Sequence, residues 1–154
     1  MDNQALINEM VSKARKALSE LESYSQERID ELCRICCEAF AAHAEELAEE
    51  AVAETGLGNV PDKIMKNTGS PDGVWYAIKG KKSVGIIGHD ERRHLTFVTH
   101  PKGIISCVIP TTSPNITILF NGVYALKGRN VILCAPIPGP RSPRSTPARS
   151  STTP

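Results

Sequence analysis

The sequence of 154 residues contains no long hydrophobic run. A membrane-spanning helix needs roughly 18–20 consecutive apolar residues, and no stretch of this chain approaches that length. Acids at Asp2 and Glu9 stand where a secretory signal would have its apolar core. The five cysteines are an odd number and lack the spacing of a disulfide framework. We therefore expect free thiols in a cytoplasmic protein that does not contact a membrane.

Three common motifs are also missing. Gly56-Leu57-Gly58 begins like a dinucleotide-binding loop, but Pro61 stands where the third glycine belongs and no strand precedes it. Residues 80–83 end like a phosphate-binding loop without its leading glycine or its hydroxyl. Cys33 and Cys36 have no second pair of ligands at zinc-binding spacing, so we expect them to pack in a core and expect no metal site.

Charge is distributed unevenly along the chain. Residues 1–54 contain thirteen acids and five bases, whereas residues 55–154 contain four acids and thirteen bases. A basic half can indicate nucleic-acid binding. Here the acids fall on the outer faces of expected helices and the last three arginines lie in a terminal tail. Nucleic acid is therefore an unexpected partner.

The first third of the chain has the apolar spacing of three amphipathic helices. Apolar residues recur every three or four positions from Leu6 to Leu21, and again from Ile29 to Phe40. Ser23 and Gln26 have the spacing of a capping box for the second helix. The third helix is expected over Ala44 to Glu54, ending at Gly56.

The remainder predicts a turn-rich segment, a hairpin and a βαβ unit. Residues 59–82 are mixed in character and contain two prolines, so no regular element is expected there. Alternating residues in 83–88 and 94–99 predict a hairpin with its turn at 89–92. Further on, two short apolar runs suit parallel strands buried on both faces, with a proline-bounded loop and a helix between them. These runs are 104–109 and 131–134, the loop is 110–115 and the helix is 116–127.

The composition changes abruptly at Ile137. The last 18 residues hold five Pro, four Ser, three Thr and three Arg, with no acid. We therefore divide the chain into an ordered part, 1–136, and a disordered tail, 137–154. We expect the tail to be a frameshift product. The alternative is an evolved partner-binding segment, because Pro140-Arg141-Ser142-Pro143 has the PxxP pattern.

Three stretches together resemble the aldehyde dehydrogenase superfamily. They are the acidic helix with its Glu54-Thr55-Gly56 end, the run from Pro101-Lys102-Gly103 into Pro110-Thr111-Thr112-Ser113-Pro114, and Leu126-Lys127-Gly128-Arg129-Asn130 through Ala135-Pro136. The last two are similar to the CoA-acylating branch, as is Gly56–Val60 followed by Asp62-Lys63. The resemblance implies an α/β fold: N-terminal helices, a β-hairpin and the first βαβ unit of a Rossmann-like cofactor domain, truncated.

The resemblance also implies an activity. The family oxidises an aldehyde with NAD or NADP: a cysteine thiolate attacks the aldehyde, nicotinamide takes the hydride, and coenzyme A takes the acyl group. It implies that Thr112 occupies the oxyanion position. It further implies that Ile109, Pro110, Thr111 and Thr112 line the cofactor, with Ala135 and Pro136 on its adenosine side. The residues alone allow a second interpretation, in which the same loop is a strand-to-helix turn without a ligand.

The residues that carry the family's chemistry are missing from these 154 residues. Its nucleophile, its glutamate base and its glycine-rich turn lie beyond the position of Pro136, and none of the five cysteines stands in a nucleophile's context. We therefore expect an inactive fragment of an enzyme that forms homo-oligomers at full length. The alternatives are an interaction protein acting through its tail and an assembly fragment that joins intact subunits through the hairpin.

Overall fold

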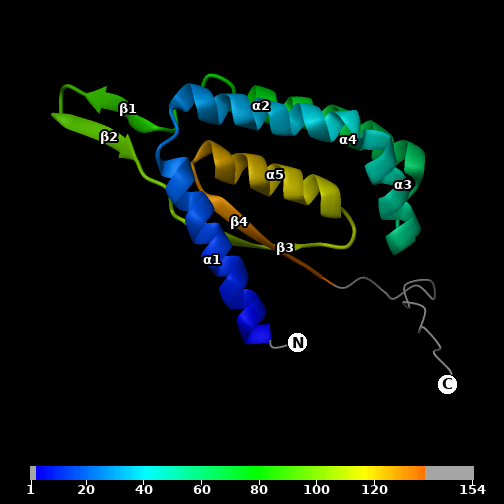
Figure 1. Cartoon of the computed structure of the whole chain (residues 1–154). Coiled ribbons are helices and arrows are strands. Elements are labelled where there is room, and N and C mark those ends of the chain that lie inside the picture. Colours follow the sequence, from blue (N-terminus) through cyan, green and yellow to red (C-terminus); the bar gives the residue numbers. More distant parts are fainter. Residues whose placement is uncertain (1–2, 138–154) are drawn as a thin grey trace.

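The computed structural model describes residues 3–137, which form five helices and four strands (Figure 1). In chain order these elements are α1 (Asn3–Glu22), α2 (Gln26–Ala42), α3 (Ala44–Thr55), α4 (Val60–Ile78), β1 (Gly85–Asp90), β2 (Leu95–Thr99), β3 (Ile104–Ile109), α5 (Pro114–Lys127) and β4 (Val131–Pro136). The expected α/β architecture of N-terminal helices, a hairpin and one βαβ unit is confirmed. Residues 138–154, most of the predicted tail, lie outside the described part.

The three N-terminal helices are present, and α3 ends at Gly56 in the left-handed conformation (φ 67°) as expected. The predicted capping box at Ser23 and Gln26 is wrong. Ser25 caps α2 by accepting a hydrogen bond from the Arg28 N–H, whereas Ser23 donates back to the Glu20 carbonyl at the end of α1. Gln26 instead accepts from the N–H groups of Ser83 and Val84, at 2.7 and 3.0 Å, and so ties α2 to the start of the hairpin.

The segment 59–82, expected to lack regular structure, contains the 19-residue helix α4. Asn59 is its N-cap, accepting from the Asp62 N–H at 2.9 Å, and Pro61 lies in the first turn, where no helical N–H is needed. Pro71 lies inside the helix but is buried against its neighbours, which offsets the lost backbone hydrogen bond. The buried face includes Lys63 and Asn67, so apolar periodicity could not reveal it.

The hairpin forms as predicted, with its turn two residues later than expected, at 91–94. β1 and β2 pair antiparallel, with an irregularity between Ile86 and Gly88. The hairpin projects from the rest of the described chain (Figure 1). Its large apolar side chains are therefore about half exposed, and they are Ile86, Ile87, Leu95, Phe97 and Val98.

The βαβ unit is also confirmed: β3 and β4 pair in parallel, joined by α5. The expectation that both strands are buried on both faces is wrong. In β3, Cys107 and Ile109 are buried, but Val108 is 64% exposed, and β4 becomes exposed at Ala135. The physical reason is that this sheet has only two strands within the described residues, so much of its surface is uncovered.

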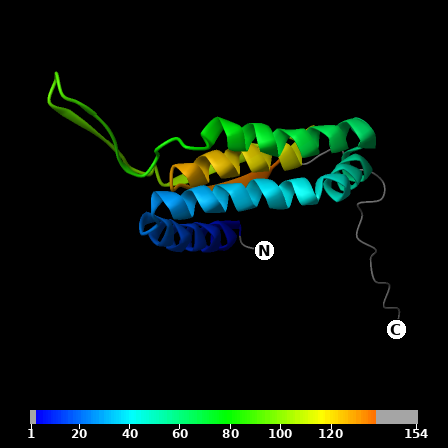
Figure 2. The same cartoon turned by 90° about the horizontal axis from the view of Figure 1, so that it is seen from above.

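The core lies between α5 and the two helices that flank it, α2 and α4 (Figure 2). α5 also contacts β3 and β4, as does α1. The core residues are almost completely buried where these three helices meet. They are Ile29, Cys33, Cys37, Val74, Ile78, Ile116, Leu119 and Val123. This core fixes α5, and α5 in turn fixes the strand pair beneath it.

Asn130 ties the amino ends of β3 and β4 together. Its side-chain oxygen accepts hydrogen bonds from the N–H groups of Lys102 and Gly103, at 2.6 and 2.9 Å. Its side-chain nitrogen donates to the carbonyls of Ala125 and Gly128, at 3.3 and 3.1 Å. A Cβ at Gly128 would stand 2.8 Å from that nitrogen, so a larger residue there would displace the Asn130 side chain. One amide side chain thus uses both of its groups across two segments.

The two charged residues beside Asn130 are structural as well. Lys127 is 6% exposed and forms an ion pair and hydrogen bond with Asp30, which links α5 to α2. Arg129, at a φ of 56°, donates to the Glu22 carbonyl at the end of α1 at 2.8 Å. The stretch 127–130 therefore joins the end of α5 to α1, α2 and the start of β3.

We predict that Asn130→Ala lowers the free energy of unfolding by about 2 kcal/mol, because the N–H groups of residues 102 and 103 lose their acceptor. Urea unfolding followed by circular dichroism measures the change. The control is Asn8→Ala on the exposed face of α1, which should change stability by less than about 0.5 kcal/mol. Equal stability of the two variants would contradict this role of Asn130.

Candidate functional site

The carboxyl ends of β3 and β4 bring together the residues predicted to form a cofactor site. In the parallel register, Val108 pairs with Ala135 and Ile109 pairs with Pro136. The loop 110–113 leaves β3 at this edge and leads into α5 (Figure 1). The predicted residues from the two strands therefore lie at one edge of the sheet. In open α/β sheets, ligands bind outside the carboxyl ends of the strands.

The side chains at this edge of the sheet differ in their burial and in their hydrogen bonds. Ile109 is 1% exposed, so its side chain belongs to the core and not to the edge. Thr111 donates its hydroxyl to the Ile137 carbonyl at 3.2 Å, and the Ile137 N–H bonds to the Ile109 carbonyl at 2.9 Å. Thr112 is exposed, and no residue of the described range 3–137 is hydrogen-bonded to its hydroxyl. Of these residues, Thr112 therefore has the side chain free to meet a ligand.

Two lysines of α4 reach the same loop, and the sequence did not identify them as site residues. Lys63 donates to the Thr112 carbonyl at 3.3 Å, and Lys66, one turn later, donates to the Ser113 hydroxyl at 3.1 Å. Lys63 is only 8% exposed. A sequence signal did exist in the helix start at Asn59, Pro61 and Asp62, because it places residues 63 and 66 three apart on one helical face.

A cavity of about 320 Å³ opens between the start of α4 and Thr112. The turn between α3 and α4 completes its wall, and the lining residues are Leu57, Gly58, Asn59, Asp62, Lys63, Lys66 and Thr112. Gly58 has a φ of 77°, and a Cβ there would come within 3.3 Å of the Lys63 Cε. The turn can therefore approach the Lys63 side chain closely only because residue 58 is a glycine.

The electrostatics of this cavity are unbalanced. Among residues 3–137, neither Lys63 nor Lys66 forms an ion pair with a carboxylate. Asp62 also lines the cavity and accepts a hydrogen bond from Asn59 at 2.7 Å. Burial lowers the pKa of Lys66, and the positive charge of Lys63 lowers it further. The lysines therefore give the cavity an excess of positive charge.

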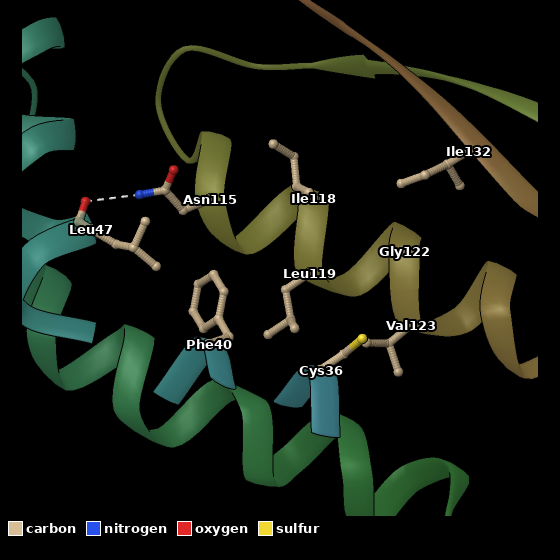
Figure 3. Close-up of a pocket in the computed structure, with 9 residues that line it drawn as sticks. All are labelled: Cys36, Phe40, Leu47, Asn115, Ile118, Leu119, Gly122, Val123 and Ile132. Atoms are coloured by element: carbon tan, nitrogen blue, oxygen red, sulfur yellow. Dashed lines mark hydrogen bonds between the residues drawn. The ribbon is translucent and has the colours of Figure 1, made fainter. Parts of the chain in front are cut away.

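A second pocket is apolar and lies between α2, α5 and β4 (Figure 3). It has a volume of about 360 Å³, and no charged residue lines it; its residues are Cys36, Phe40, Leu47, Asn115, Ile118, Leu119, Gly122, Val123 and Ile132. Its one amide, Asn115, already donates to the Leu47 carbonyl at 2.8 Å (Figure 3). Apart from the Cys36 thiol, whose pKa is raised by burial, this pocket offers apolar packing and no group for acid–base or nucleophilic chemistry.

Comparison with known proteins finds relatives of this chain among the CoA-acylating aldehyde dehydrogenases. The chain is 41% identical to the acetylating succinate-semialdehyde dehydrogenase of Clostridium kluyveri over 138 residues, which is 90% of this chain and 30% of the relative. It is 39% identical to the acylating sulfoacetaldehyde dehydrogenase of Bilophila wadsworthia over 132 residues, or 84% of this chain and 28% of the relative. The chain is homologous to part of the CoA-acylating aldehyde dehydrogenases.

The fold agrees with this family. The crystal structure of an acetylating aldehyde dehydrogenase from Geobacillus thermoglucosidasius superimposes with a TM-score of 0.84 at 36% identity, covering 87% of this chain and 30% of that one. The chain thus spans about 30% of the length of these dehydrogenases. No protein-family model matches the chain.

Four of the five cysteines have environments unlike that of a nucleophilic thiolate. Burial raises the pKa of Cys33 to about 12, and its thiol donates to the Val123 carbonyl at 3.7 Å. Burial also raises the pKa of Cys36, Cys37 and Cys134. The expectation that Cys33 and Cys36 share the buried face is half right, since Cys33 is buried, Cys36 is exposed, and Cys37 takes the second core position.

The described residues contain neither the arrangement of a metal site nor a membrane-spanning helix. Within 3–137, no group of three or more His, Cys, Asp or Glu side chains is arranged to hold a metal ion. The helices of the same range include none that is both long and apolar enough to span a bilayer.

We predict that Cys33 resists alkylation by iodoacetamide at pH 8, since a thiol with a pKa of about 12 is about one part in ten thousand thiolate at that pH. Exposed Cys36 should react first, faster than Cys33 by more than about 100-fold. Peptide mass spectrometry measures each rate, and the urea-unfolded chain is the control. A cysteine that reacts faster in the folded chain than in the unfolded one would be an activated thiolate and would contradict this assignment.

Proposed function

We propose that this chain is the N-terminal part of an NAD- or NADP-linked CoA-acylating aldehyde dehydrogenase and is inactive by itself. The observation that carries the proposal is the meeting of Pro110, Thr111 and Thr112 with Ala135 and Pro136 at the carboxyl edge of one parallel strand pair. The homology supports it, because relatives that share this stretch are named as acylating dehydrogenases of small aldehydes.

The residues at this edge fit one side of a dinucleotide site. Ala135 and Pro136 are exposed and small, so a ligand can approach the ends of the strands without displacing a large side chain. The bound nicotinamide would supply the hydride acceptor. Thr111 is held by its hydrogen bond to residue 137, which fixes the loop that borders the site. Ile109 supports the loop from the core side.

In the proposed reaction, Thr112 acts on the oxygen of the aldehyde. When a thiolate adds to the carbonyl carbon, the carbonyl oxygen gains the negative charge, and the Thr112 hydroxyl can donate a hydrogen bond to it. The thiolate would come from the part of the longer protein that follows this stretch. Its addition gives a thiohemiacetal, which is still at the oxidation level of the aldehyde. It would become a thioester by giving its hydride to the bound nicotinamide, and coenzyme A would then take the acyl group and release the thiolate. At full length we propose a cytoplasmic homo-oligomer.

We predict that the intact chain of 154 residues forms no NADH or NADPH from succinate semialdehyde, with or without coenzyme A. A chimaera of residues 1–136 with the remaining two thirds of the Clostridium kluyveri relative should form it. In the chimaera, Thr112→Ala should lower kcat by about 100-fold, and Thr112→Ser should restore most of it. Absorbance at 340 nm measures the rates.

Two outcomes would contradict this function. One is turnover by the intact chain that survives purification and disappears when one of its five cysteines is replaced. The other is a folded chimaera without activity. The unmodified relative serves as the positive control, and thermal unfolding of each chimaera verifies that it folds.

A second candidate function is an assembly role through the hairpin. The observation that favours it is the exposure of apolar residues on both of its strands, including Ile86 at 54%, Phe97 at 48% and Val98 at 50%. Exposed apolar patches of this kind mark interaction sites. The chain would then associate with an intact acylating dehydrogenase without contributing to catalysis.

For this second candidate, a tagged chain should co-purify with the intact Clostridium kluyveri relative, and the double variant Ile86→Ser, Phe97→Ser should reduce the yield by about tenfold or more. Met65→Ser is the matched control, because Met65 is 70% exposed on α4 and lies outside the hairpin. If the double variant and the control co-purify equally well, the hairpin is not the assembly surface.

A further inference from the structure

The cavity beside Thr112 has two lysine side chains that converge on one short loop. Lys63 and Lys66 lie three residues apart, on the same face of α4. Their amines donate hydrogen bonds to the adjacent residues 112 and 113, at 3.3 and 3.1 Å. The acceptors are a carbonyl and a hydroxyl, both neutral. A neutral acceptor satisfies one N–H of each ammonium group and leaves the charge uncompensated.

Uncompensated charge in a largely buried position is unfavourable unless a counter-ion is available. Lys63 is more than nine-tenths buried, and the two amines lie close enough that the pKa of Lys66 is lowered by Lys63. The neighbouring carboxylate, Asp62, provides one negative charge for two positive ones. The structure therefore leaves room for a second negative charge.

The cavity also has the size and the opening that a small ligand needs. The apolar pocket between α2, α5 and β4 has a volume of about 360 Å³ and no charged lining. The cavity beside Thr112 has a volume of about 320 Å³ and is bordered by both lysines and by exposed Thr112. It is partly open to solvent, and exposed Thr112 lies on its wall. An anion that enters can meet the two ammonium groups and that hydroxyl together.

We propose that Lys63 and Lys66, together with Thr112, form a binding site for a small oxyanion: a carboxylate, a sulfonate or a phosphate. Only the source of the anion rests on the proposed function. Within that function there are two sources, the charged end of an acidic aldehyde and a phosphate group of coenzyme A. Relatives of this chain are named for succinate semialdehyde and sulfoacetaldehyde, whose far ends are a carboxylate and a sulfonate.

The test is anion binding by the full chain of 154 residues, measured by two-dimensional amide NMR at constant ionic strength. Sulfate, succinate and ethanesulfonate should each produce saturable shifts at residues 58, 63, 66 and 112, whereas chloride and the neutral analogue propionamide should not. Lys66→Met should weaken binding by about tenfold or more, as expected for losing a charge-assisted hydrogen bond. Lys66→Arg should restore it.

The matched control is Lys82→Met, which removes the same charge from an exposed position after α4. It should bind each anion within about twofold of the unmodified chain. The proposal is overturned if no anion saturates, if the shifts lie elsewhere, or if Lys66→Met and Lys82→Met have the same effect. Circular dichroism of each variant verifies folding, and Lys66→Arg keeps the test decisive if Lys66→Met unfolds.

Adenosine 3′,5′-bisphosphate distinguishes the two sources. If it competes with succinate at these residues and binds more tightly, the anion comes from coenzyme A; if succinate and ethanesulfonate bind more tightly, it is the charged end of the aldehyde. These measurements need no turnover. An inactive chimaera together with intact anion binding rejects only the proposed function, and an active chimaera without anion binding rejects only this site.

Discussion

The hydrogen bonds of Asn130 hold the two parallel strands in register, and the rest of the sheet edge depends on them. Parallel strands cannot be joined by a tight turn, so β3 and β4 are connected only through α5. Asn130 closes that connection by binding the N–H groups before β3 and the carbonyls at the end of α5. The Lys127–Asp30 pair then anchors the same helix end to α2. Lys127 and Asn130, which belong to the stretch that resembles the family, therefore stabilise the fold.

This arrangement separates the structural end of the βαβ unit from its ligand-facing end. Once Ile104 is paired with Val131, the register fixes Ile109 opposite Pro136 at the other end of both strands. The loop after β3 then emerges beside the end of β4, and its position follows from hydrogen bonds made six residues away. The loop residues need few packing contacts of their own, which leaves Thr112 exposed. Function can be placed there because stability is provided elsewhere.

The sequence predicted the elements whose side chains follow a simple period, and it failed where polar residues are buried. Apolar spacing of three and four located α1 to α3, and short apolar runs located β3 and β4. The sequence did not predict α4, because its inward face carries Lys63, Asn67 and Pro71. Those residues are buried by contacts that only tertiary structure reveals: Asn67 donates to the Ala44 carbonyl at 3.1 Å, and Lys63 reaches across to residue 112. The same omission hid the two lysines of the candidate site, whereas the resemblance alone gave Thr112.

The buried lysines of this chain can be compared with one another. Lys127 and Lys63 are almost equally buried, at 6% and 8% exposed. Lys127 has a carboxylate partner, which balances its charge within the fold. Within residues 3–137, the Lys63 amine has only a carbonyl oxygen as its partner, and the Lys66 amine beside it has only a hydroxyl. If Lys63 and Lys66 served packing alone, uncharged side chains of similar length would avoid the cost of desolvating their charges. Their placement at an open cavity, next to the one exposed hydroxyl of the strand edge predicted from the family, is instead what recognition of a negatively charged group requires.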